Sequence, residues 1–179
     1  MSDLLAGGGA MTKRVTGAAA LLAFLASIPF ANWWLATNGM WQTFLGPVPS
    51  GVWVVAFSFV ARDLAQVALG RKWAWGAIAV GAALSYWLAG PELALASGAA
   101  FLWSESTDAL VFTPLANRGR FTLGVVLSGY AASAVDSLLF LWLAFGSVSG
   151  WWQLWLVKTA FVLIATPVAW FLRRRMTGR

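Results

Sequence analysis

Charged side chains lie where an apolar sequence should have none. An ionised side chain at the centre of a membrane-spanning helix costs about 2.5–3.5 kcal/mol on insertion scales. Such groups must pair with one another or line a wet cavity inside the protein. A single pair can serve helix packing alone, but a set of six favours a polar chamber that holds a ligand. The six are Arg62, Asp63, Glu105, Asp108, Asp136 and Lys158.

The spacing of these charges predicts which of them meet. Glu105 and Asp108 are three residues apart, so they share one face of a helix. Counting along alternating helices places Asp136 and Lys158 at a similar depth, which predicts an ion pair between them. Arg62 is expected to bridge toward Glu105 or Asp108. Because four acids accompany only two bases, at least one carboxyl group is expected to be neutral or bound to a ligand.

Aromatic residues accompany the acids in the same segments. Phe101 and Trp103 lie within about one helical turn of Glu105, and either ring is expected to stack on a ligand. Rings and carboxylates together suit a planar heterocycle, because carboxylates accept hydrogen bonds from ring N–H and amino groups. The second, fourth, fifth and sixth apolar segments carry the charges and are therefore expected to build the site.

Composition excludes most catalytic and metal chemistry. The chain contains no cysteine and no histidine, so disulfides, Cys/His zinc sites, histidine-ligated haem and histidine-based triads are ruled out. Lys158 with Ser133 or Ser137 could act as base and nucleophile, but an ion pair with Asp136 is the better use of that lysine. We expect no enzyme, no cofactor and no metal site. No GxxxxGK[ST] motif occurs, which excludes ATP hydrolysis by that route.

Six long apolar segments must position these side chains. A helix needs about 20 apolar residues to span the hydrocarbon core of a bilayer, and this chain is 60% hydrophobic and only 10% charged. The predicted fold is an all-α membrane protein with one transmembrane domain, residues 15–172, and glycine and proline separate its segments. The helices are expected at about Val15–Ala36, Ser50–Leu69, Trp73–Ala89, Glu92–Leu115, Phe121–Phe145 and Trp151–Leu172.

The basic residues predict the orientation of the chain. Ten of the 12 lysines and arginines lie in the two tails, residues 1–14 and 173–179, or in the connections near residues 70–72 and 118–120. The other connections carry none, which is the positive-inside pattern. Both termini are therefore expected in the cytoplasm, with the protein in the plasma or inner membrane. The net charge of +6 then reflects contact with anionic lipid rather than nucleic acid.

One external connection is long enough to have a role of its own. Residues 37–49 are uncharged and rich in aromatic side chains. They form either an ordinary loop or a lid over the bundle, with Trp41, Gln42 and Phe44 pointing inward. Elsewhere, the small residues of Ala77–Gly81 can serve packing within the bundle or a homodimer.

Four stretches carry a recognisable combination of motifs. They are FVARDLAQVALGRK at Phe59–Lys72, SESTDALVFTPL at Ser104–Leu115, VDSLLFLWLAFG at Val135–Gly146 and KTAFVLIATP from Lys158. Together they resemble the vitamin-uptake-transporter-like (VUT) family over about two thirds of the chain. The resemblance implies six helices shaped like the substrate-binding (S) subunits of energy-coupling-factor importers, with a chamber that opens outward. It also implies import of queuosine precursors, which are 7-deazaguanine bases such as preQ0 and preQ1.

The same resemblance implies roles for individual residues. Glu105, Asp108, Asp136 and Lys158 match polar positions of the family, so Asp136 with one of the other acids would bind ring donors while Lys158 holds Asp136 in place. The partners would be a nucleobase-like small molecule and the lipid bilayer. The alternative is a vitamin-binding S component, which needs a separate ATPase module; co-purification with ATPase subunits would distinguish the two.

Overall fold

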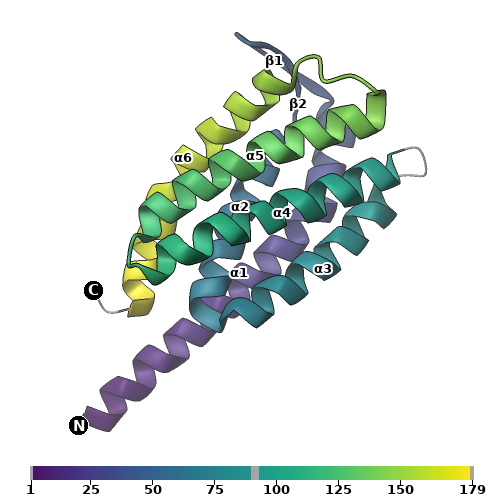
Figure 1. Ribbon diagram of the computed structural model, residues 1–179. Helices are drawn as coiled ribbons and strands as arrows, with labels where there is room; N and C mark the ends of the chain where they lie inside the picture. The colour runs from purple at the N-terminus through teal and green to yellow at the C-terminus, as the bar shows by residue number, and fades with distance from the viewer. Residues whose placement is uncertain (1, 90–92, 178–179) are drawn as a thin grey trace.

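The computed structural model describes residues 2–89 and 93–177, which form six helices and one short hairpin (Figure 1). The predicted turn at Gly90 and Pro91, the start of the fourth segment at Glu92, and Arg179 of the basic tail lie outside the described residues. The elements in chain order are α1 (Ser2–Asn38), β1 (Met40–Thr43), β2 (Gly46–Pro49), α2 (Val52–Leu69), α3 (Arg71–Leu88), α4 (Ala94–Asn117), α5 (Phe121–Phe145) and α6 (Trp151–Thr177).

The fold is an all-α membrane protein, as predicted. Within the described ranges, four helices are long and apolar enough to cross a bilayer: Met11–Asn38, Val52–Leu69, Phe121–Phe145 and Trp151–Met176. The other two predicted crossings are also helices of the same bundle, α3 with 18 residues and α4 with 24. They are less apolar because α3 begins with Arg71 and Lys72 and α4 contains two acids.

The helices lie side by side with both termini at one end of the bundle and the hairpin at the other (Figure 1). This arrangement follows from an even number of helices joined by short connections. Helix α1 begins at Ser2, well before the predicted Val15, and its first turns project beyond the bundle (Figure 1). Hydropathy marks only the apolar part of a helix, whereas the helix itself continues into the predicted N-terminal tail. It ends at Asn38, and the next residue, Gly39, has a φ of 61°, a left-handed conformation that favours glycine.

Helix α2 forms the centre of the bundle. In α2, 61% of the apolar span is buried, against 22–39% in the other three spans. The main core packs around α2 with residues from α4, α5 and α6, including Phe59, Phe112, Phe121 and Val162. Most side chains on α2 therefore face protein, so a charge on its buried face must find its partner inside the bundle.

The long connection between α1 and α2 forms an antiparallel hairpin rather than an irregular loop. Met40 pairs with Pro49 and Thr43 pairs with Gly46. Val48 on β2 is fully buried and packs in a small core cluster with Val52 of α2 and Leu154 of α6. The hairpin is thus anchored to the end of the bundle that lies opposite the termini.

Candidate functional site

A cavity of about 200 Å³ lies inside the bundle near the hairpin. Side chains from all six helices line it, together with Pro49 of β2. The expectation that only α2, α4, α5 and α6 would build the site is therefore wrong, because α1 and α3 close the remaining sides of the same space. Its lining is mostly apolar, and its polar members are Ser27, Asn32, Ser58, Ser85, Ser97, Asp136 and Lys158.

The two charged residues of the cavity wall form an ion pair. The Lys158 ammonium group donates to a carboxylate oxygen of Asp136, which confirms the predicted pairing. Lys158 also donates to Ser137 Oγ at 3.3 Å, and Ser104 Oγ donates to Asp136 Oδ1 at 3.4 Å. The Asp136 side chain keeps 15% of its surface exposed. Its carboxylate is held in place by α4 and α6 yet remains accessible to a ligand.

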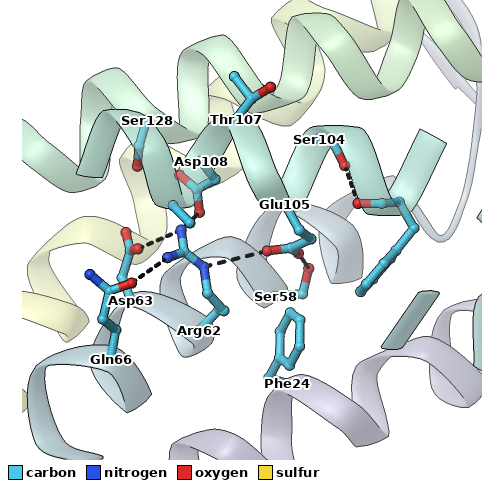
Figure 2. Close-up of polar contacts among 12 residues, drawn as sticks. Phe24, Ser58, Arg62, Asp63, Gln66, Ser104, Glu105, Thr107, Asp108 and Ser128 are labelled. Atoms are coloured by element: carbon cyan, nitrogen blue, oxygen red, sulfur yellow. Dashed lines mark hydrogen bonds and ion pairs between the residues drawn. The ribbon is translucent and has the colours of Figure 1, made fainter. Parts of the chain in front are cut away.

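A second group of charges surrounds Arg62, deeper in the bundle (Figure 2). The guanidinium group contacts Asp63 Oδ1 at 2.8 Å and Glu105 Oε2 at 3.5 Å, and it pairs with Asp108 as well. Its Nη1 also donates to Gln66 Oε1 at 3.1 Å. The predicted bridge from Arg62 is thus confirmed and reaches both acids of α4. We call Arg62, Asp63, Glu105 and Asp108 the arginine cluster.

The arginine cluster is sealed from solvent. Its four side chains are 0–1% exposed, and the ring of Phe112 lies 5.7 Å from the Arg62 guanidinium carbon. Taking an ion out of water costs several kcal/mol unless partners compensate for it. If all three acids were ionised, one guanidinium group would face three carboxylates, which leaves two negative charges without a counter-charge in the cluster.

The cluster adjoins the cavity without lining it. Ser58 of α2 lines the cavity, and its hydroxyl group donates to Glu105 Oε1 at 3.4 Å. Figure 2 shows Ser58 beside Glu105 and Ser128 beside Asp108. Of the eight predicted site residues, Phe101, Asp136 and Lys158 line the cavity, while the four members of the arginine cluster lie behind its wall.

The predicted stacking role of Trp103 is wrong. Its side chain is 62% exposed on the outside of α4. Two residues along a helix turn a side chain by about 200°, so Trp103 lies opposite both Phe101 and Glu105. Phe101 lines the cavity and rests on Phe24 of α1, with ring centroids 5.8 Å apart. The second aromatic ring of the cavity is Phe140, one turn after Asp136.

The hairpin does not form a closed lid over the bundle in this conformation. Trp41 packs against the small core cluster, but Gln42 is exposed and Phe44 is 97% exposed. Phe44 follows Thr43 into the turn of the hairpin, where no bundle surface is within reach. The inward orientation expected for Gln42 and Phe44 is therefore wrong, while a gating role for the hairpin stays a prediction.

Sequence reasoning missed the contributions of α1 and α3 to the cavity. Ser27, Asn32 and Ser85 are the polar residues that interrupt these two helices, and that was the available signal. Ser27 and Asn32 donate to backbone carbonyl groups of their own helix, at 2.6 and 2.9 Å. Polar side chains satisfied in this way fit into an apolar helix, which is why they carry little information about a site.

These features define a helical membrane protein with a small interior site beside a buried ion pair. Residues 86–172 match a family described as "Putative vitamin uptake transporter". The match covers α4, α5 and α6 as far as residue 172, with Glu105, Asp108, Asp136 and Lys158, and it begins after α2, the helix that carries Arg62. Over this stretch the chain is similar to that family, which indicates transport of a small molecule across a membrane. No curated protein and no solved structure matches the chain in the same comparisons.

Proposed function

We propose that this protein imports a queuosine precursor, a 7-deazaguanine base such as preQ0 or preQ1. The observation that carries the proposal is the accessible Asp136–Lys158 ion pair in a mostly apolar cavity, within the stretch that matches the transporter family. A cavity of about 200 Å³ suits a compact ligand, since sites for drug-sized molecules measure about 300–1,000 Å³.

The chemistry of the wall matches a planar base with several N–H groups. The Asp136 carboxylate accepts hydrogen bonds from ring N–H and exocyclic amino groups. Lys158 orients this carboxylate through their ion pair, as an outer-shell partner does in a binding site. Phe101 and Phe140 supply aromatic surface on the same cavity. An apolar surround with few, well-placed polar groups is the usual composition of a small-molecule site.

The direction of transport follows from the charge distribution. Arg71 and Lys72 begin α3, and Arg118 and Arg120 lie in the α4–α5 connection. Both places lie at the end of the bundle with the termini (Figure 1). The positive-inside rule places that end in the cytoplasm. The cavity, near the hairpin, then faces outward, and the packed aromatic residues of the main core separate it from the cytoplasm. An outward-facing site closed toward the inside suits uptake.

The test is the queuosine content of tRNA in a bacterium that lacks both precursor synthesis and its own importer. Cells expressing the protein and given trace preQ1 are expected to regain queuosine, and Asp136→Ala is expected to abolish the gain. Phe101→Leu is expected to reduce it, with Trp103→Leu as the matched control because Trp103 faces away from the cavity. The amount of membrane-inserted protein must be equal for the wild type and the three variants.

The S-component alternative gives a different result in the same cells. A vitamin-binding S component would leave queuosine unrestored and would co-purify with ATPase subunits. Restoration in a strain without any energy-coupling-factor module would contradict that alternative. Absence of queuosine despite normal membrane insertion would contradict import of preQ1.

A further inference from the structure

The arginine cluster contains more acid than its single base can balance. Arg62 is the base in all three ion pairs of the cluster, and its partners are three carboxyl groups. Among the described residues, four carboxyl oxygens of the cluster, both oxygens of Asp63 with Glu105 Oε2 and Asp108 Oδ1, are buried without a hydrogen-bond partner. An ionised carboxylate in such a place lacks the donors that would stabilise it, and one guanidinium group cannot neutralise three such charges. A proton on the carboxyl group removes the charge and supplies a donor for a neighbouring oxygen.

The charged groups on neighbouring helices do not supply the positive charge that would neutralise the excess carboxylates. Helix α5 presents Asp136 toward this region, and α6 presents Lys158, but these two already neutralise each other. Helix α4 contributes only the two acids of the cluster. The basic residues of α3, Arg71 and Lys72, are exposed at its first turn. Within residues 2–89 and 93–177, no set of acidic side chains is arranged to hold a metal ion.

One member of the cluster has a route to the cavity. Glu105 lies farthest from the guanidinium group, at 3.5 Å from Arg62 Nε, whereas Asp63 lies at 2.8 Å. Its other carboxyl oxygen lies 3.4 Å from Ser58 Oγ, which also donates to Val55 O at 2.7 Å and reaches Glu105 by rotating its hydroxyl group, and Ser58 lines the cavity. Of the three acids, Glu105 therefore loses the least attraction to Arg62 when it takes a proton. It also needs only one hydroxyl group between itself and the cavity.

We propose that the arginine cluster is a proton-binding site, loaded from the cavity through Ser58 and Glu105, and that its protons drive uptake. The proton passes from water in the cavity to the Ser58 hydroxyl group, which passes its own proton to Glu105 Oε1. Binding of the proton neutralises one buried negative charge and removes one of the two ion pairs that join Arg62 of α2 to α4, so the contact between these helices weakens while Arg62 keeps its pair with Asp108. The coupling role rests on the proposed function; the proton binding does not.

Proton binding is tested by infrared spectroscopy of the purified protein in lipid at neutral pH. The carbonyl absorption of a protonated carboxylic acid, which shifts in heavy water, is expected in the wild type and is expected to fall in Glu105→Gln. Asp136→Asn is the matched control and should leave that absorption unchanged, because Asp136 is paired with Lys158. Ser58→Ala keeps the cluster intact and should retain the absorption but slow its exchange in heavy water.

Absence of a protonated carboxyl absorption in the wild type would overturn the proposal. An absorption that persists unchanged in each of Glu105→Gln, Asp63→Asn and Asp108→Asn would overturn it as well, since the signal would then come from outside the cluster. The Ser58→Ala variant keeps the test valid if a charge-removing variant fails to fold.

Coupling is tested in proteoliposomes with preQ1 as the probe. An inside-alkaline pH gradient is expected to raise the preQ1 accumulation of the wild type severalfold, whereas Glu105→Gln should show the same accumulation with and without the gradient. Wild-type preQ1 accumulation that is the same with and without the pH gradient would overturn the coupling role. If the wild type takes up no preQ1, the proposed function is contradicted, and the infrared spectrum alone decides whether the cluster binds protons.

Discussion

At the scale of single residues, the interior of the bundle depends on two basic side chains with different tasks. Arg62 binds three carboxyl groups and a glutamine through one planar group, which the forked geometry of guanidinium allows and a lysine ammonium does not. Lys158 meets one carboxylate and one hydroxyl group. The first arrangement holds helices α2 and α4 together, and the second leaves a carboxylate accessible in the cavity.

Removing Arg62 should be severely destabilising. Arg62→Met leaves three acids without a counter-charge in a sealed site, and breaking a buried pair in this way costs about 3–5 kcal/mol. Arg120→Met is the matched control, because Arg120 is exposed in the α4–α5 connection. We expect a much lower midpoint of thermal unfolding in detergent for the first variant and little change for the second. Equal midpoints would contradict a structural role for Arg62.

The Asp136–Lys158 pair can be measured by a double-mutant cycle. Lys158→Met leaves Asp136 unpaired, and Asp136→Asn leaves Lys158 unpaired, so each single variant should unfold at a lower temperature. The double variant removes both charges and should recover part of the loss, with a coupling energy of about 0.5–3 kcal/mol. Additive losses would show that the two side chains act independently. Ligand uptake should stay lost in the double variant, since the carboxylate acceptor is gone.

At the scale of helices, small residues let neighbours approach closely enough to shape the cavity. A Cβ atom on Gly81 of α3 would lie 2.6 Å from Phe101 Cε1 and 3.2 Å from Ile28 Cδ1. Gly129 of α5 has the same role against α6, where a Cβ atom would lie 2.7 Å from Val162 Cγ1. Glycine is therefore required at these positions for helix packing.

This packing predicts opposite outcomes for two glycines of the same helix. Gly81→Ala must displace the Phe101 ring from the cavity wall, and overpacking of this kind costs about 1–3 kcal/mol, so uptake of preQ1 should fall. Gly76→Ala meets no atom within 4 Å and should be neutral or stabilising, because alanine favours the helix by about 0.5–1 kcal/mol. Queuosine content of tRNA and thermal unfolding measure the two effects. Equal uptake by both variants would contradict the position given to Phe101.

The same scale shows which parts of the site a sequence can predict. The Asp136–Lys158 and Arg62–Asp108 pairs could be predicted because a buried charge has few possible partners and helix depth limits them further. The outward direction of Trp103 could also be predicted, because a separation of two residues from Glu105 puts the two side chains on opposite faces of the helix. Closeness in sequence to the acids does not bring the ring to their face. The hairpin at residues 40–49 could not be predicted from the sequence, because its short strands contain glycine and prolines, which are uncommon in strands.

At the scale of the whole molecule, the fold and the charge distribution together predict a topology that the chain itself makes easy to test. The chain contains no cysteine, so each introduced cysteine is the sole thiol. Phe44→Cys lies in the exposed turn of the hairpin, and Arg118→Cys lies in the α4–α5 connection at the opposite end (Figure 1). In intact cells a membrane-impermeant maleimide should label the first variant and leave the second unlabelled.

Ala89→Cys decides the number of crossings, because it follows α3, one of the two less apolar helices. If α3 and α4 cross the membrane, this thiol lies outside with the hairpin, and the chain makes six crossings. It also lines the cavity, so excess preQ1 should slow its labelling while leaving Phe44→Cys unaffected. Labelling of Ala89→Cys only after the cells are opened would place α3 and α4 differently, and an outward-facing chamber would then be excluded.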